Sequence, residues 1–135
     1  MHLINILLCL ASAASAANAA PVASAPGSNC RDSGVCAGIE ASLSSAIAQM
    51  KEMDQHQRFS DGQHITCVDT NSEGSSSLCL SFQGTGRSWS VFQAAWFAQA
   101  LIEKGCQACG SLSLGSDHKH GELTSSVISK PASGL

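Results

Sequence analysis

The sequence has little charge, few aromatic side chains and no tyrosine. Of its 135 residues, 13% are charged and 4% are aromatic, and this share of charged residues is about half that of an ordinary soluble domain. The seven Lys and Arg residues are scattered, and the formal net charge is −3. A nucleic-acid-binding protein needs a clustered basic face, and a protein held on anionic lipids needs a polybasic segment. The composition therefore argues against both classes.

The common motifs of hydrolytic and nucleotide-binding sites are also missing. Serine is abundant, but no Gly-x-Ser-x-Gly segment precedes a helical pattern, and no glycine-rich phosphate loop occurs. The carboxylates of Glu52 and Asp54 lie two residues apart, so they do not share a helix face as an acid–base pair would. We therefore expect a protein that is not an enzyme and that uses no cofactor.

The apolar run at the N-terminus is too short to cross a membrane. Residues 3–10 are mostly Leu and Ile, whereas a membrane-spanning helix needs about 20 apolar residues. Ala and Ser follow, and Ala17-Asn18-Ala19 offers a small-x-small cleavage pattern. We predict a secretory signal peptide over residues 1–19, a disordered Pro/Ala/Ser/Gly leader over 20–29, and an extracellular mature chain without a transmembrane segment.

Secretion changes the meaning of the cysteines. Cys9 lies inside the predicted signal peptide and would be lost with it. An even number of cysteines in a small exported domain indicates disulfide bonds, but their spacing alone does not choose among the pairings. The six that remain are Cys30, Cys36, Cys67, Cys79, Cys106 and Cys109.

Hydrophobic periodicity predicts two helices and at least three strands. Apolar residues three or four apart favour helices over about 38–53 and 89–104. Strand patterns occur over 63–68, 77–82 and 121–129, and the polar segment between the first two is typical of a hairpin loop.

Three aromatic residues, Trp89, Trp96 and Phe97, lie in or beside the second predicted helix. Because no basic or repeated pattern accompanies them, we expect them to pack in the core or between helix and sheet. We do not expect them to form a platform for a ligand.

Three short segments occur in a fixed order around these predicted helices. Residues 30–36 read Cys-Arg-Asp-Ser-Gly-Val-Cys, and residues 105–111 read Gly-Cys-Gln-Ala-Cys-Gly-Ser directly after the second helix. Asp117 then precedes Gly-Glu-Leu-Thr at 121–124, which opens the last strand. Together they resemble the fungal killer-toxin family typified by the virus-encoded KP-four toxin of a smut fungus. The resemblance covers about residues 30–128.

The resemblance implies an α+β fold, namely a small disulfide-stapled α/β sandwich with two helices packed on one face of an antiparallel sheet. The killer-toxin-like domain would occupy residues 30–130, with a tail at 131–135. The family pattern implies the disulfides Cys30–Cys106 and Cys36–Cys109, which leaves Cys67 and Cys79 for each other. Closing the long loop between Cys30 and Cys106 could stabilise the fold by about 4–5 kcal/mol in the chain-entropy model.

The resemblance also implies a secreted toxin that inhibits the growth of competing fungi by acting on calcium channels. Such a blocker would present a basic, rigid loop to an acidic channel vestibule. The family toxin is basic just before its central cysteine, whereas this chain has Gln-His-Ile-Thr at 63–66. The remaining cationic candidates for contact with a target are Arg31, Arg58, His64 and Arg87.

A second hypothesis is a secreted effector or virulence-associated interaction module without channel-blocking activity. Its specificity would lie in the divergent loops over 54–63, 70–76 and 112–120, since binding residues concentrate on loops of a rigid scaffold. Under either hypothesis we expect a monomer whose partner is a membrane ion channel or a surface protein of a host or competitor, and not a nucleic acid.

Two alternatives concern Cys106 and Cys109, which have the spacing of a redox dithiol. The pair follows a helix, where the helix dipole has the wrong sign to lower a thiol pKa. With His118 and His120 the same cysteines would also supply four zinc ligands. Export into an oxidising compartment disfavours both alternatives, so we expect no metal.

Overall fold

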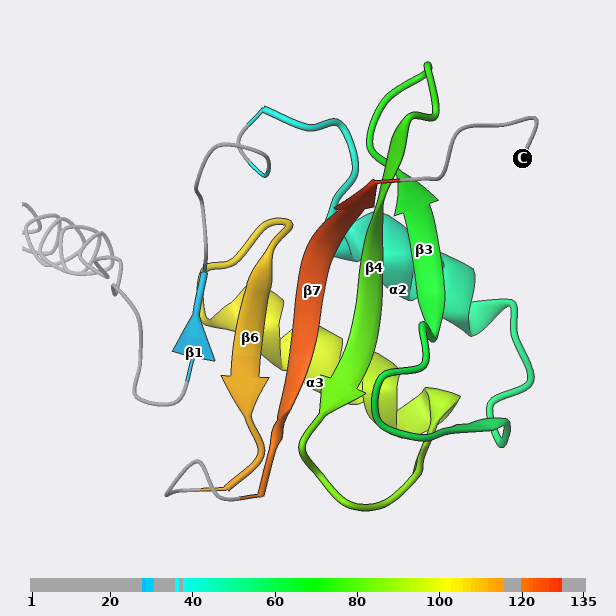
Figure 1. The fold of residues 1–135 in the computed structure, drawn as a ribbon, viewed down its shortest axis with the longest axis vertical. Coiled ribbons are helices and arrows are strands. Elements are labelled where there is room, and N and C mark those ends of the chain that lie inside the picture. Colours follow the sequence, from blue (N-terminus) through cyan, green and yellow to red (C-terminus); the bar gives the residue numbers. More distant parts are fainter. Residues whose placement is uncertain (1–27, 31–35, 37, 116–119, 130–135) are drawn as a thin grey trace, which may run out of the picture.

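The computed structural model describes residues 28–30, 36, 38–115 and 120–129 (Figure 1). The predicted signal peptide, most of the leader and the tail lie outside these residues. The elements in chain order are β1 (Ser28–Asn29), α2 (Leu43–Lys51), β2 (Arg58–Phe59), β3 (Thr66–Asp69), β4 (Ser76–Gln83), β5 (Trp89–Ser90), α3 (Val91–Glu103), β6 (Gly110–Ser113) and β7 (Glu122–Ser129).

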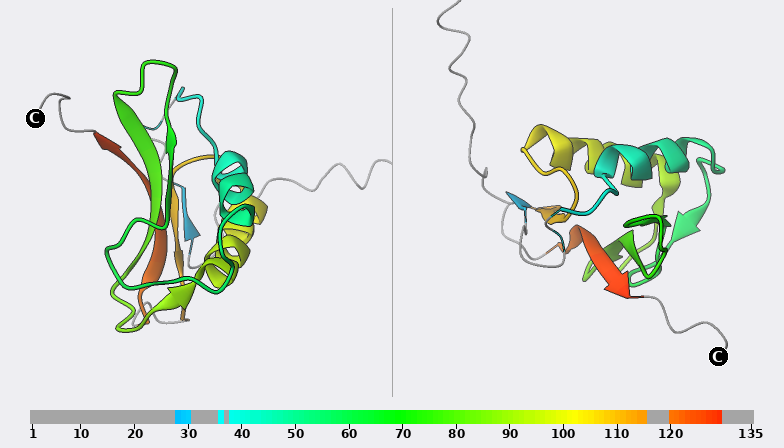
Figure 2. Two further views of the ribbon diagram at one scale, coloured as in Figure 1. Left: turned by 90° about the vertical axis from the view of Figure 1, so that its right-hand side faces the viewer. Right: turned by 90° about the horizontal axis from the view of Figure 1, so that it is seen from above.

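An antiparallel sheet carries the fold. Five strands lie in the order β1-β6-β7-β4-β3, while β2 and β5 form a separate two-stranded ribbon. Strands β4 and β7 pair along eight residues each and occupy inner positions of the five-stranded sheet. Both helices pack on one face of this sheet, and no helix of the described residues covers the other face (Figure 2). The α+β prediction, with two helices on one sheet face, is confirmed.

Capping residues set the helix bounds more tightly than periodicity predicted. Helix α2 begins at Leu43 rather than 38, because the hydroxyl of Ser42 accepts a hydrogen bond from the Ser45 amide and caps the helix. Helix α3 begins at Val91 rather than 89, because Ser90 and Gln93 form a reciprocal capping box. Trp89 therefore belongs to β5 and not to the helix.

Strands β3, β4 and β7 correspond to the three predicted strands, with β3 starting at Thr66 instead of residue 63. The short strands β1, β2, β5 and β6 were not predicted. The prediction of a leader extending to residue 29 is wrong for its last two residues, because Ser28–Asn29 pair with β6. Strands of two residues are too short to carry an alternating pattern.

The core lies between the helices and the covered face of the sheet. Leu80 and Phe82 alternate along β4 and are fully buried, as is Leu123 on β7. Alternation follows from the two-residue period of a strand, which places every second side chain on the same face. The helices contribute fully buried side chains to the same cluster: Leu43, Ala46 and Met50 from α2, and Val91, Ala94, Ala98 and Leu101 from α3.

Three disulfides reinforce this small core. Two of them tie the N-terminal segment to the segment after α3, and the third joins directly opposed positions of β3 and β4. They are the pairs that the family resemblance implies, with Cα–Cα distances of 5.1, 6.1 and 4.1 Å for Cys30–Cys106, Cys36–Cys109 and Cys67–Cys79.

Candidate functional site

Two exposed arginines lie at the same loop beside the short β2–β5 ribbon. In this ribbon Arg58 lies opposite Ser90. The Arg58 side chain crosses to the next loop, where Nε donates to Ser88 Oγ at 2.9 Å and Nη2 donates to the Ser88 carbonyl at 2.7 Å. Arg87 directly precedes Ser88 and is also exposed. We call Arg58, Arg87 and the 84–88 loop the arginine surface.

The carboxylate of Asp61 fixes the loop that carries Arg87. Asp61 Oδ2 accepts from the Thr85 and Gly86 amides at 2.9 and 2.8 Å, and Oδ1 accepts from Thr85 Oγ1 at 2.6 Å. Gly84 and Gly86 have φ angles of +66° and +74°, a backbone region that side-chain-bearing residues rarely adopt. The glycines let the loop turn, and the carboxylate then holds it by three hydrogen bonds.

These hydrogen bonds also keep Asp61 ionised. The pKa of Asp61 is lowered, mainly by the hydrogen bond from the Thr85 side chain and further by the backbone N–H groups of Gly86 and Thr85. Partial burial acts in the opposite direction and does not overcome them. The loop is therefore anchored on a negative charge, and Arg58 and Arg87 remain exposed beside it.

Trp89 connects the same loop to the core. The Arg87 guanidinium carbon lies 4.1 Å from the centroid of the Trp89 ring, within cation–π range. The indole N–H donates to Thr85 Oγ1 at 3.0 Å. The Trp89 ring also stacks on Phe82, with 5.0 Å between ring centroids, and packs edge-on against Phe97, with 5.7 Å between ring centroids. Arg87 is thus supported by an aromatic stack that reaches the buried core.

A comparison with known protein families matches most of the chain. The family model described as Kp4 covers residues 11–129. The chain belongs to the Kp4 killer-toxin family. No curated protein matches the sequence. The family assignment makes this a killer-toxin-like protein, and the arginine surface is a feature of its α+β domain.

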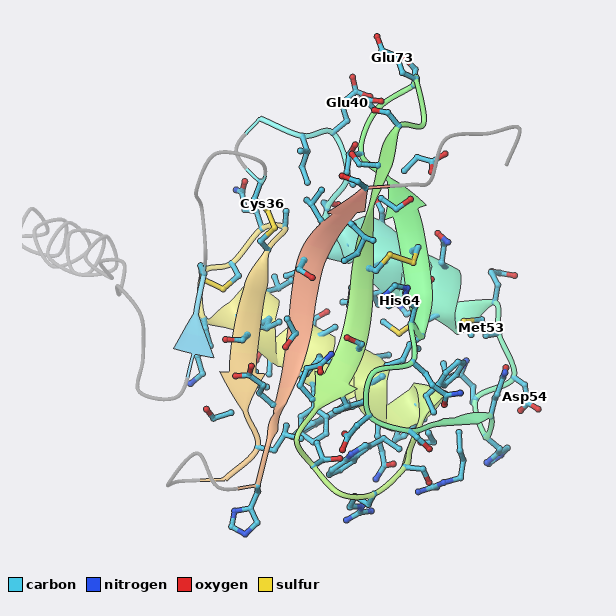
Figure 3. All side chains as sticks on the ribbon, in the orientation of Figure 1. Cys36, Glu40, Met53, Asp54, His64 and Glu73 are labelled. Atoms are coloured by element: carbon cyan, nitrogen blue, oxygen red, sulfur yellow. A yellow bond between two sulfur atoms is a disulfide. The ribbon has the colours of Figure 1, made fainter. Side chains whose placement is uncertain are left out.

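Of the three target-contact candidates that the structure of this Kp4 domain describes, Arg58 and Arg87 lie at the same loop. His64 lies elsewhere, just before β3 and beside the Cys67–Cys79 disulfide (Figure 3). Arg31 falls outside the described residues. The role of Asp61 could not be predicted, because no local signal in the sequence pairs it with a residue 24 positions away.

The prediction for the aromatic residues is wrong in two respects. Trp89 and Phe97 pack together as expected, but Trp96 is 65% exposed. A basic residue, Arg87, does accompany Trp89. Phe92, which the sequence reasoning overlooked, is 61% exposed one turn before Trp96. A helical projection would have found this pair, because both positions lie off the apolar stripe of α3.

The zinc and redox interpretations of Cys106 and Cys109 do not fit this state of the Kp4 domain. Each sulfur is bonded to a different, distant cysteine. Of the two histidines in that hypothesis, His120 is exposed and His118 lies outside the described residues. Within the described part of the chain, no helix is long and apolar enough to cross a membrane.

Proposed function

We propose that this Kp4-family protein is secreted and inhibits the growth of competing fungi by blocking a calcium channel. Arg58 and Arg87 would contact an acidic site on the outer surface of that channel. The observation that carries the proposal is the arginine surface, because the anchored 84–88 loop carries Arg87 and accepts hydrogen bonds from the exposed Arg58 of β2. Three disulfides support secretion, since such bonds persist in oxidising compartments.

The chemistry of the surface suits a carboxylate-lined target. A guanidinium group presents a planar set of N–H donors that matches the geometry of a carboxylate. Cation channels carry rings of Asp or Glu at their selective sites. A loop already held by Asp61 and Trp89 loses little conformational freedom on binding. With a net charge of −3, attraction to such a target depends on this local surface.

Growth inhibition tests the proposal directly. The oxidised, secreted form is added to a panel of fungi, alone or as the variant Arg58→Gln/Arg87→Gln. We expect the double variant to lose about tenfold or more in inhibitory potency, as interface arginines that act as hot spots do. Lys104→Gln is the matched control because it removes a positive charge at the far end of α3, about 20 Å away at 1.5 Å per residue.

Excess calcium in the same assay separates the mechanism from the activity. Inhibition that calcium relieves supports channel block. Inhibition that persists in calcium retains the toxin and excludes the calcium-channel target. Equal potency of the double variant and wild type would remove the arginine surface from the proposal.

A second candidate function rests on the aromatic pair of α3. Phe92 and Trp96 are exposed one turn apart, and aromatic residues are enriched in the centres of protein interfaces. In this alternative the protein is a secreted effector or interaction module that binds a surface protein through α3. No inhibition across the fungal panel, together with a partner whose binding is lost in Phe92→Ala/Trp96→Ala, would favour it.

A further inference from the structure

The Cys67–Cys79 disulfide differs from the other two in its exposure. Cys67 is exposed on β3, although its partner Cys79 is only 4% exposed. In the other two disulfides Cys30 is half-buried, and Cys36, Cys106 and Cys109 are 7%, 2% and 5% exposed. A thiol reductant needs access to a sulfur atom that it can attack. Cys67 is the most exposed of the six disulfide-bonded cysteines, so we expect its disulfide to open first.

A histidine lies next to the same sulfur atoms. A ring nitrogen of His64 and the Sγ atoms of Cys67 and Cys79 all lie within 4.8 Å of one another. Figure 3 shows His64 beside β3, the strand that carries Cys67, and both residues are exposed. We propose that reduction of the disulfide by a low-molecular-weight thiol creates a Zn²⁺ site with His64, Cys67 and Cys79 as its three protein ligands.

The donor set suits zinc. Cysteine thiolate and histidine nitrogen are the usual zinc ligands, and three protein ligands leave a fourth tetrahedral position for water. Both His64 and Cys67 are exposed, so water can reach that position. Two thiolates and one neutral imidazole balance the charge of the divalent ion. No carboxylate is needed for neutrality.

The sheet keeps the ligands close after the disulfide opens. Cys67 and Cys79 are directly opposed residues of antiparallel strands. Strand β4 stays fixed by its eight pairs with β7. The segment that carries His64 and Cys67 is held by two further hydrogen bonds. The Ile65 amide donates to the Leu80 carbonyl at 2.8 Å, and Gln49 Nε2 donates to the Cys67 carbonyl at 3.2 Å. These bonds hold the strand that carries Cys67 and the residue next to His64.

The chemical step balances with the thiol as reductant. Two thiol molecules form a disulfide with each other and supply two electrons and two protons. The bond between Cys67 Sγ and Cys79 Sγ breaks, and each sulfur becomes a thiol. Binding of Zn²⁺ then displaces one proton from each of these thiols. The metal itself is neither oxidised nor reduced.

The test combines limited reduction with Co²⁺ as a spectroscopic substitute for Zn²⁺. The oxidised, secreted form is treated with glutathione, the thiol is removed without oxygen, and alkylation mapping identifies the opened disulfide. We expect alkylation only at Cys67 and Cys79, and thiolate-to-cobalt charge-transfer bands that Zn²⁺ abolishes. His64→Ala should weaken Co²⁺ binding by more than about tenfold, because even the loss of an outer-shell partner costs that much.

His56→Ala is the matched control, since His56 is exposed but belongs to a different turn. It should bind Co²⁺ like the wild-type protein. Three outcomes would overturn the proposal: another disulfide opens first, the oxidised protein gives the same bands, or His64→Ala binds as tightly as wild type. Opening of another disulfide first would contradict the exposure argument. The same bands from the oxidised protein would show that the thiolates are not ligands, and unchanged binding by His64→Ala would show that the histidine is not a ligand.

The thermal midpoint of the reduced protein provides a second test of the site, which applies even where reduction destabilises the fold. Zn²⁺ should raise the thermal midpoint of the reduced protein, because a ligand that binds the folded state stabilises it. It should not raise the midpoint of Cys67→Ser/Cys79→Ser, which lacks both thiolates. An equal shift in both proteins, or no shift in either, would contradict the site.

Discussion

The two ends of α3 are held by different chemistry. At its C-terminal end, Cys106 and Cys109 are covalently bonded to the N-terminal segment. At its N-terminal end, the 84–88 loop is held by the Asp61 carboxylate and by the Trp89 ring (Figure 1 shows both ends). The disulfide end restricts the unfolded chain, whereas the hydrogen-bonded end positions exposed arginines. Stability and the proposed contact with a target should therefore be separable by mutation.

The largest expected effect lies at the disulfide end. Cys36→Ser/Cys109→Ser should lower the free energy of unfolding by about 4 kcal/mol, because the bond closes a long loop in the unfolded chain. Its sequence separation is 73, against 12 for Cys67–Cys79. Cys67→Ser/Cys79→Ser should therefore cost about 1.5 kcal/mol less in the same chain-entropy model. Urea unfolding measures both, and an equal loss in the two variants would contradict the loop-length argument.

A smaller effect is expected at the hydrogen-bonded end. Asp61→Asn weakens charge-assisted bonds to Thr85 and Gly86, which at a partly exposed site should cost about 1 kcal/mol. The lowered folded-state pKa means that this stabilisation is present above the unfolded pKa of about 3.9 and is lost as pH falls through the folded value. The difference from wild type should therefore shrink below about pH 4.

Urea midpoints measured over a pH series test whether this difference in stability shrinks or grows toward acid pH. Asp54→Asn is the control, because Asp54 also accepts a backbone N–H bond, from His56 at 2.9 Å, but does not touch the 84–88 loop. A difference between wild type and Asp61→Asn that grows toward acid pH would contradict the role of Asp61 as an ionised anchor.

The smallest stability effect is expected for Arg87 itself. Arg87→Gln removes an exposed cation–π contact with Trp89, which is worth about 0.5–1 kcal/mol. Its inhibitory potency should nevertheless fall, since the proposed function places this guanidinium against the target. Urea unfolding and growth inhibition, measured on the same preparation, separate the two effects. Unchanged inhibitory potency of Arg87→Gln would contradict a role of Arg87 in target contact. A loss of stability as large as that of Cys36→Ser/Cys109→Ser would contradict the separation of stability from target contact.

Much of the architecture was predictable because it depends on local order. The spacing of Leu43, Ile47 and Met50 predicts the buried face of α2, and these side chains are buried. The alternation that predicts β4 and β7 reflects the same kind of regularity. The ribbon of β2 and β5 could not be predicted, because it consists of two residues from each strand.

The candidate site was only partly predictable for the same reason. Arg58 and Arg87 could be named as exposed cations, but nothing in the sequence pairs them. Their association depends on the contact of Arg58 with Ser88, 30 residues away. The exposure of Trp96, by contrast, could have been predicted, because its position lies off the apolar stripe of α3.

The sequence by itself determined the family, the even set of cysteines, the two helices and the main strands. These follow from motif order and from periodicities of a few residues. The tertiary structure alone decided which scattered charges share a surface, because the contacts of Asp61 with Thr85 and of Arg58 with Ser88 close loops of 24 and 30 residues. Such contacts form only when a packed core has already brought distant segments together.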